Sequence, residues 1–287
     1  MSASEMSNTE QWRETARQTW ANSVAARSWF GSQQAAMTQA ATEGIIRLGQ
    51  VKQGMQVLDV ATGVGDPAIA LAKLVGPDGH VQAVDMVNKM LEAAEEEARH
   101  QGVTNVSFQQ ANAEHLPFPD QSFDLVTCKH AVMLFADVGA GLREIRRVLK
   151  TGQRAVFTAQ GLPEENPWQS CIMRVFSKYV EMSPAEPGTP HPHRFAHPGT
   201  LPEALREAGF SQVEEESPTL PWNWHGTPEE YWDSRRNQGA LFPQLVERLD
   251  PEQRDDVNTE VLDSISEYYD GTQVNFTARI VLASAVR

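Results

Sequence analysis

One segment near the start of the chain constrains the fold more than any other. Residues 57–72 read VLDVATGVGDPAIALA: an apolar run reaches Asp59, Gly63 and Gly65 follow, and an apolar pattern resumes. A strand, a glycine turn and a helix in this order form the first unit of an open α/β sheet. Bare backbone at the turn and unpaired N–H groups on the following helix let a ligand approach closely.

The same order recurs along the first half of the chain. Apolar runs ending in turn residues predict strands over 55–60, 80–86, 103–112, 122–130 and 154–160, with helices between them. We expect one helix over 66–74, another capped by Asn88 and a third over 141–150. Strands that alternate with helices at this spacing imply right-handed crossovers and a parallel sheet.

The alternation stops after residue 161, and the remainder predicts two insertions into the sheet. The expected organisation is an N-terminal helical cap (1–50), a cofactor-binding core (51–161), an insertion (162–199), a core helix and strand (200–220), a helical cap insertion (221–276) and a last strand (277–287). We expect the caps to cover the carboxyl ends of the strands, where open α/β sheets bind ligands.

Composition excludes several classes of partner. The formal net charge of −14 disfavours nucleic acid and anionic membrane surfaces, because both require basic patches. No run approaches 18 apolar residues, so we expect no membrane span, and the polar N-terminus does not resemble a secretory signal. Cys128 and Cys171 lack the spacing of a metal site. We therefore expect no bound metal and a cytoplasmic location.

Two ligand classes use such a glycine loop: dinucleotides and S-adenosylmethionine. Residues 63–68 fit G-x-G-x-x-A, and Asp85, 20 positions after Gly65, suits the ribose hydroxyls of either ligand. Asp66 stands where a pyrophosphate would lie, and its charge would repel that group. Asp59 is a natural partner for an ammonium group. These carboxylates favour S-adenosylmethionine, while an NAD(P)-dependent oxidoreductase stays open as an alternative.

Four blocks carry a resemblance to a known family: VLDVATGVG (57–65), AVDM (83–86), ANAEHLPFPDQSFDLVTC (111–128) and LREIRRVLKTGQRAVF (142–157). Together they resemble class I S-adenosylmethionine-dependent methyltransferases, in the branch that includes the ubiquinone/menaquinone C-methyltransferases. The resemblance implies a Rossmann-like α/β fold, with a seven-stranded, mostly parallel sheet whose last strand is antiparallel. A dehydrogenase would lack that reversed strand.

The resemblance also implies roles for residues of this chain. Those that would contact the cofactor are Asp59, Ala61, Gly63 and Gly65 on its methionine side, Asp85 at the ribose, Met86, Asn112 and Ala113 at the adenine, and Lys129 again near the methionine part. Asn112 departs from the family, in which an aspartate is more usual. Trp29 is expected to close over the sulfonium, because an aromatic face stabilises positive charge.

The expected reaction is methyl transfer to a small organic molecule by in-line displacement, with oxygen and carbon acceptors favoured. A general base would assist such acceptors, and His130, after the fourth strand, is the candidate. A non-catalytic protein that keeps the cofactor fold is a further alternative. The sequence indicates neither the acceptor's identity nor the oligomeric state.

Overall fold

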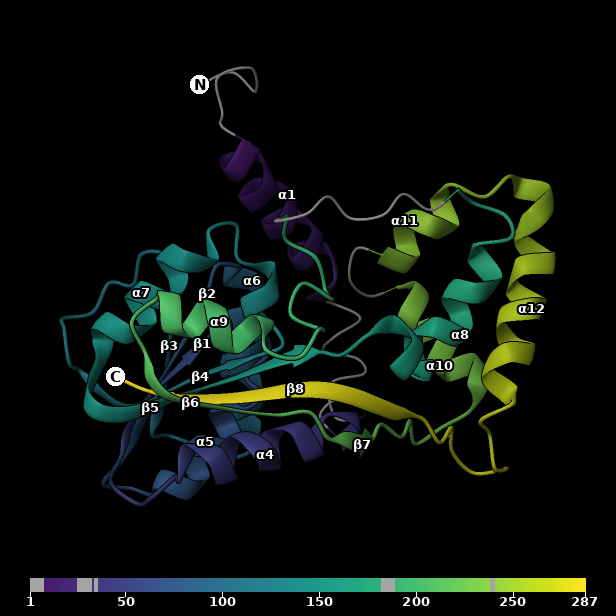
Figure 1. The fold of residues 1–287 in the computed structure, drawn as a ribbon. Coiled ribbons are helices and arrows are strands. Elements are labelled where there is room, and N and C mark those ends of the chain that lie inside the picture. Colours follow the sequence, from purple (N-terminus) through teal and green to yellow (C-terminus); the bar gives the residue numbers. More distant parts are fainter. Residues whose placement is uncertain (1–7, 25–32, 34–35, 182–188, 238–240) are drawn as a thin grey trace.

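Eight strands form one sheet in the described part of the chain, and seven of them follow one another in a single row. The computed structural model describes residues 8–24, 33, 36–181, 189–237 and 241–287. The sheet order is β3-β2-β1-β4-β5-β8-β6 (Figure 1). The strands of this row are β1 (Gln56–Val60), β2 (His80–Asp85), β3 (Val106–Gln110), β4 (Phe123–Lys129), β5 (Leu149–Gln160), β6 (Ser211–Glu216) and β8 (Thr277–Val286).

The direction of the last strand confirms the predicted fold class. Strands β1 to β5 pair in parallel, whereas β8 runs antiparallel to both β5 and β6. The parallel strands therefore share one carboxyl edge, and β8 begins at that edge. The reversed strand is the feature that we expected to separate a methyltransferase from a dehydrogenase.

Two local expectations were wrong, and one expected helix begins two residues later than predicted. The strand expected within residues 200–220 is divided into β6 and a short β7 (Thr219–Pro221), because Pro218 has no N–H for the ladder. Strand β7 pairs with β8 antiparallel. The helix expected over 66–74 is α5 (Ala68–Val75), which begins after Pro67. Asn88 is the first residue of α6 (Asn88–His100) and does not cap it, since its side chain bonds Glu92 instead.

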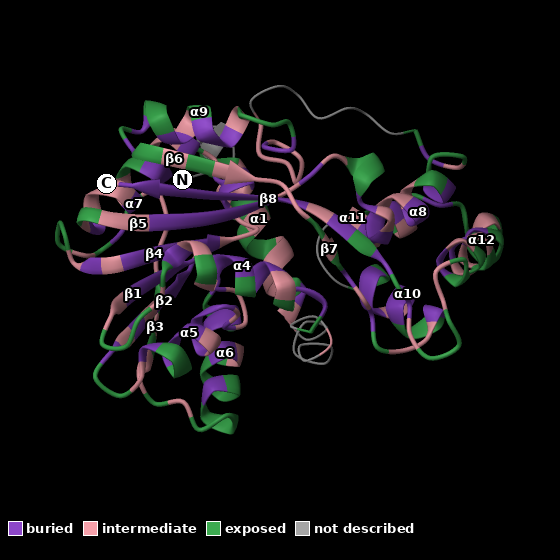
Figure 2. Ribbon diagram, turned by 60° about the horizontal axis from the view of Figure 1, so that its bottom comes forward, coloured by how far each residue is buried: buried purple, intermediate pink, exposed green. Residues whose placement is uncertain are grey.

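Helices cover both faces of the sheet, so the central strands β1, β4 and β8 are buried along most of their length. On one face, α4 (Gln39–Gly49) and α5 pack against Val57, Leu125 and Val156. On the other face, α7 (Val138–Val148) and α9 (Thr200–Glu207) pack against the alternate positions, such as Leu58 and Val126. Figure 2 shows the strands buried between helices whose outer sides are exposed.

A second group of helices stands beyond the carboxyl ends of the parallel strands (Figures 1 and 2). It comprises α8 (Pro167–Phe176), α10 (Pro228–Arg236), α11 (Leu241–Glu247) and α12 (Arg254–Ser266). Its apolar side chains belong to the same buried cluster as the α4/α5 face of the sheet. We call these helices the helical cap. They are continuous with the core and are not a separate body.

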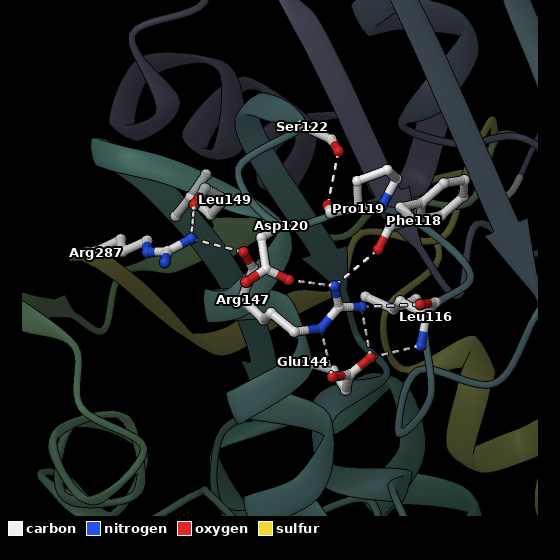
Figure 3. A network of polar contacts seen from close by, with 9 residues as sticks. All are labelled: Leu116, Phe118, Pro119, Asp120, Ser122, Glu144, Arg147, Leu149 and Arg287. Carbon is white, nitrogen blue, oxygen red and sulfur yellow. Dashed lines mark hydrogen bonds and ion pairs between the residues drawn. The ribbon is translucent and has the colours of Figure 1, made fainter.

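A polar network on the α7 side ties several segments together (Figure 3). The Arg147 guanidinium bonds both oxygens of Glu144, at 2.8 and 2.9 Å, the carbonyls of Leu116 and Phe118, and Asp120. These contacts use all five N–H donors of an arginine. The bidentate pair lowers the pKa of Glu144. The network fixes the loop between β3 and β4 against α7.

The N-terminal helix α1 (Asn8–Asn22) lies over the loops that follow β3 and β4. Arg13 forms an ion pair with Glu114, and the Trp12 indole donates to the carbonyl of Leu134 at 3.3 Å. Among the described helices, none is long and apolar enough to cross a membrane.

Candidate functional site

Asp85 joins the first two loops at the carboxyl edge of the sheet. One carboxylate oxygen accepts from the N–H of Gly63 and the other from the N–H of Val87, each at 2.9 Å. Gly63 adopts φ +56°, and a Cβ built there would have nothing within 4 Å. Gly65 adopts φ +98°, and a side chain there would press on Ile69. The loop thus has an open side at Gly63 and a packed side at Gly65.

Asp59 is a buried carboxylate that is only half satisfied. It has no exposed surface, and one oxygen accepts from the Thr127 hydroxyl at 2.6 Å. The other oxygen, Oδ2, has no hydrogen-bond partner among the described residues. Burial raises the pKa of Asp59 to about 7. A positively charged group in contact with Oδ2 would stabilise the ionised form.

Lys129 holds the start of the glycine-loop helix to α4. Its ammonium bonds the hydroxyls of Thr38 and Thr42, at 2.9 and 2.8 Å, and the carboxylate of Asp66. Three acceptors match the three N–H donors of a lysine. Contact between Lys129 and a cofactor stays a prediction, and these bonds favour a positioning role. They also neutralise Asp66, so that carboxylate does not repel a phosphate as the sequence had suggested.

The predicted adenine-side residues lie on the neighbouring loops. Gln110, which ends β3, donates to the carbonyl of Met86 at 2.9 Å. The amide oxygen of Asn112 accepts from the N–H of Glu114 at 3.0 Å. Ala113 lies between Asn112 and Glu114 in the turn that follows β3. The loops after β1, β2 and β3 are thus tied to one another, as the predicted nucleoside site requires.

His130 follows β4 at φ +50°, a backbone conformation that is uncommon for a histidine. Its N–H donates to the carbonyl and the hydroxyl of Thr158, at 3.1 and 2.8 Å. Both ring nitrogens are buried and have no partner among the described residues. Burial, reinforced by Lys129, lowers the pKa of His130 to about 3. A role as general base stays a prediction, and the neutral ring favours hydrogen bonding over proton uptake.

Aromatic side chains of the two insertions form a chain of contacts that begins at His130. Its ring packs edge-on against Trp222, with the centroids 5.8 Å apart, and Trp222 lies 5.9 Å from Trp168. The Tyr231 hydroxyl donates to the carbonyl of Trp168, which connects α10 to α8. The helical cap therefore reaches the end of β4 through aromatic contacts. Trp29 lies outside the described residues.

Sequence reasoning missed several residues of this edge. Thr127 faces Asp59 because β1 and β4 are adjacent and these two positions are register partners. Thr38 and Thr42 reach Lys129 from α4, across about 90 positions of sequence that no local pattern connects. Gln160 carries a buried amide oxygen without a partner among the described residues. A polar residue at the end of an apolar strand was the signal that could have found it.

These features fit S-adenosylmethionine. The ligand combines a ribose diol with an ammonium group. Asp85 lies at the end of β2, and each of its oxygens accepts one backbone bond. Asp59 has an orphaned buried oxygen, and Gly63 leaves its backbone accessible. A diphosphate would instead face an uncompensated buried carboxylate.

Comparison with known proteins agrees with this assignment. Residues 51–185 match the family described as "Methyltransferase domain". The demethylmenaquinone methyltransferase of Geobacillus kaustophilus is 35% identical over 181 residues, which cover 60% of this chain and 77% of that protein.

Two solved structures share the fold. The YcgJ protein of Bacillus subtilis has a TM-score of 0.56 at 22% identity, and the match covers 87% of this chain and 98% of that protein. The phosphoethanolamine N-methyltransferase 2 of Haemonchus contortus, solved with S-adenosyl-L-methionine, has a TM-score of 0.57 at 17% identity, over 99% of this chain and 60% of its own. The chain belongs to the S-adenosylmethionine-dependent methyltransferases of class I.

Proposed function

We propose that this enzyme methylates a flat, hydroxylated aromatic molecule of the quinol class, at a ring carbon. The demethylmenaquinone methyltransferase of Geobacillus kaustophilus, at 35% identity, supports this class of acceptor. The observation that carries the proposal is the edge-on contact between His130 and Trp222, which brings an aromatic wall to the strand ends where the methyl group would be presented.

The cofactor residues are part of the same proposal. Asp85 would hold the ribose hydroxyls, and Asp59 would face the ammonium group. Ala61, Gly63 and Gly65 would line the methionine side, and Met86, Asn112 and Ala113 would surround the adenine. When bound, S-adenosylmethionine supplies an electrophilic methyl group, whose S–C bond breaks as the acceptor carbon bonds to it, leaving the electron pair on sulfur.

The remaining tasks belong to the chain. Trp168 and Trp222 would exclude water and hold the acceptor ring flat, since an aromatic surface stacks on another aromatic surface. His130, as a neutral imidazole, would hydrogen-bond an acceptor hydroxyl and so increase electron density in the ring. Methylation would make the ring cationic, and the ring proton at the methylated carbon would then be acidic enough to pass to water as the product leaves. The apolar side chains of the helical cap are buried against the core, and the net charge of −14 is unsuited to a polyanion. Both features support a small acceptor over nucleic acid.

O-methylation of a phenol is the second candidate. The pKa of His130, lowered to about 3, disfavours it, because an unactivated hydroxyl requires a base that takes up its proton. Two free, buried thiols, Cys128 and Cys171, support our proposal that the protein works in the cytoplasm.

The test is methyl transfer from S-adenosylmethionine labelled with ¹³C in its methyl group. Acceptors would be 1,4-dihydroxynaphthalene under anaerobic conditions, simple phenols, amines and thiols. We expect a labelled ring-methyl signal with the dihydroxynaphthalene. A labelled methoxy signal would favour the second candidate. Transfer to amines or thiols, and to no hydroxylated ring, would contradict both.

A further inference from the structure

Most buried polar atoms in folded proteins have hydrogen-bond partners, so those without one call for a physical reason. Two adjacent strand ends in this protein carry three such atoms among the described residues. They are Nδ1 and Nε2 of His130, which follows β4, and Oε1 of Gln160, which ends β5. None of the three belongs to the predicted cofactor contacts around Asp59 and Asp85.

The backbone places the two residues at one edge. Strands β4 and β5 are parallel neighbours in which Lys129 pairs with Thr158. His130 N–H bonds both the carbonyl and the hydroxyl of Thr158, and Gln160 stands two residues further along the same strand. Gln160 is in turn the register partner of Ile280 on β8. The orphaned atoms therefore lie where the strand ends meet the helical cap.

The surroundings of these atoms are apolar and aromatic. The His130 ring packs against Trp222, and Trp222 packs against Trp168, both of them buried. Ile280, beside Gln160, is buried too. Water has little access to such a site, so an unpaired amide oxygen there attracts a donor strongly. A ligand that satisfies these atoms must be flat and mostly apolar, with polar groups at its edge.

The chemistry of the atoms defines those polar groups. An amide oxygen only accepts hydrogen bonds, and a neutral imidazole accepts one and donates one. Burial holds the pKa of His130 low, so the ring is neutral at physiological pH. With the amide turned so that Oε1 is the buried atom, a hydroxyl group satisfies Gln160, whereas a carbonyl or a carboxylate would meet it oxygen to oxygen. The reduced, dihydroxy form of an aromatic acceptor satisfies the set, and its oxidised quinone form does not.

We propose that Gln160 and His130 form a two-point hydrogen-bonding site that orients the acceptor ring by its hydroxyl groups and selects the reduced ring over the oxidised one. This inference rests on the proposed function and names the residues that determine its specificity. His130 would bond one hydroxyl, and Gln160 Oε1 would accept from the other.

The test compares two ligands of the same ring. Calorimetry would measure the binding of 1,4-dihydroxynaphthalene and of 1,4-dimethoxynaphthalene, which cannot donate, to the complex with S-adenosylhomocysteine under anaerobic conditions. We expect wild type to prefer the dihydroxy ligand by roughly tenfold and Gln160→Leu by only about threefold, since one neutral hydrogen bond contributes several-fold in affinity. Gln160→Glu, which keeps an accepting oxygen, should retain the preference.

The matched control is Gln153→Leu. Gln153 lies on β5 as well, but at its opposite end, where its backbone carbonyl accepts from the N–H of Arg287. This variant should keep the wild-type preference. Affinity for S-adenosylhomocysteine and the melting temperature report whether each variant is folded, and Gln160→Met replaces Gln160→Leu if the latter does not fold.

The outcomes separate the inference from the function on which it rests. If wild type prefers the dihydroxy ring and folded Gln160→Leu keeps that preference in full, Gln160 does not contact the acceptor and the inference is overturned. If wild type binds S-adenosylhomocysteine but neither ring, the proposed acceptor class fails, and the inference fails with it. A preference that falls in Gln160→Leu and persists in Gln153→Leu supports it.

Discussion

The two polar clusters of this protein differ in how completely they are satisfied. Around Arg147, every guanidinium donor has an acceptor, and both oxygens of Glu144 are bonded. At the carboxyl edge of the sheet, Asp59, His130 and Gln160 each keep a buried atom without a partner in the described structure. A complete network stabilises the fold by itself, whereas an incomplete one loses stability until a ligand completes it.

The comparison assigns different consequences to mutations. Changes in the Arg147 network should lower stability and leave ligand affinity alone. Removing an unpartnered buried atom at the carboxyl edge should lower ligand affinity without lowering stability. Four measurements test this distinction.

The largest expected effect is that of Arg147→Met. Removing the guanidinium leaves Glu144 with the N–H of Leu116 as its remaining donor and takes the Arg147 donor from the carbonyls of Leu116 and Phe118. We expect the free energy of unfolding to fall by about 3 kcal/mol. Chemical denaturation would measure it. The control Arg146→Met removes a single exposed bond, to the carbonyl of Gly209, and should cost under about 1 kcal/mol. A loss of cofactor affinity in folded Arg147→Met, with stability unchanged, would reverse the assignment.

Asp85→Ala should weaken the binding of S-adenosylhomocysteine by roughly tenfold or more, because charge-assisted bonds to the ribose would be lost. Calorimetric titration would measure the affinity. Asp124→Ala is the matched control: this aspartate lies at the opposite end of the parallel strands, where it bonds Gln56 N–H and Lys150. That variant should bind normally. Equal affinities for Asp85→Ala and wild type would mean that the ribose lies elsewhere.

The raised pKa of Asp59 predicts how stability and cofactor affinity change with pH. Its folded pKa, about 7, is above the ordinary 3.8, so the free protein loses stability as pH rises through this interval. A bound ammonium group favours the carboxylate. Affinity for S-adenosylhomocysteine should therefore rise with pH by up to about tenfold per unit below pH 7, and level off above it.

Asp59→Asn should remove this dependence, since an amide does not titrate. Titrations at several pH values between 5 and 8, on wild type and variant, would measure it. A flat profile for wild type would show that Asp59 does not face the ammonium group.

The smallest expected effect belongs to Asn112→Asp. A carboxylate at this position, which the family more often has, would accept from the adenine amino group more strongly than an amide oxygen. We expect S-adenosylhomocysteine to bind about threefold more tightly, with unfolding unchanged within error. Weaker binding would place the adenine away from this loop.

The fold was largely predictable because its signals are local. Each strand, turn and helix around Asp59 and Asp85 lies within a short stretch, and the reversed strand β8 followed from the resemblance. The sequence did not predict the division of β6 from β7 at Pro218, although a proline in a strand is a known signal. It also misplaced the role of Asn88, because an asparagine can occupy the first turn as well as the cap.

The site was predictable only in part. The sequence placed Asp59 and Asp85 at the carboxyl ends of their strands, because each follows an apolar run directly in the sequence. Their contact with a cofactor stays a prediction. The pairing of Lys129 with Asp66, and of both with α4, depends on contacts between segments far apart in the chain. Because Lys129 compensates the charge of Asp66, Asp66 no longer explains why a diphosphate is disfavoured. The buried, unpartnered oxygen of Asp59 explains it instead. The sequence did not indicate Gln160, because only the structure shows that its amide oxygen is buried without a partner among the described residues.

The most direct test is a crystal structure with S-adenosylhomocysteine. We predict that its ribose hydroxyls bond Asp85, that its amino group approaches Asp59 Oδ2, and that its sulfur faces His130 and Trp222. A nucleoside bound elsewhere, with protein side chains filling the space beside Gly63, would contradict the account.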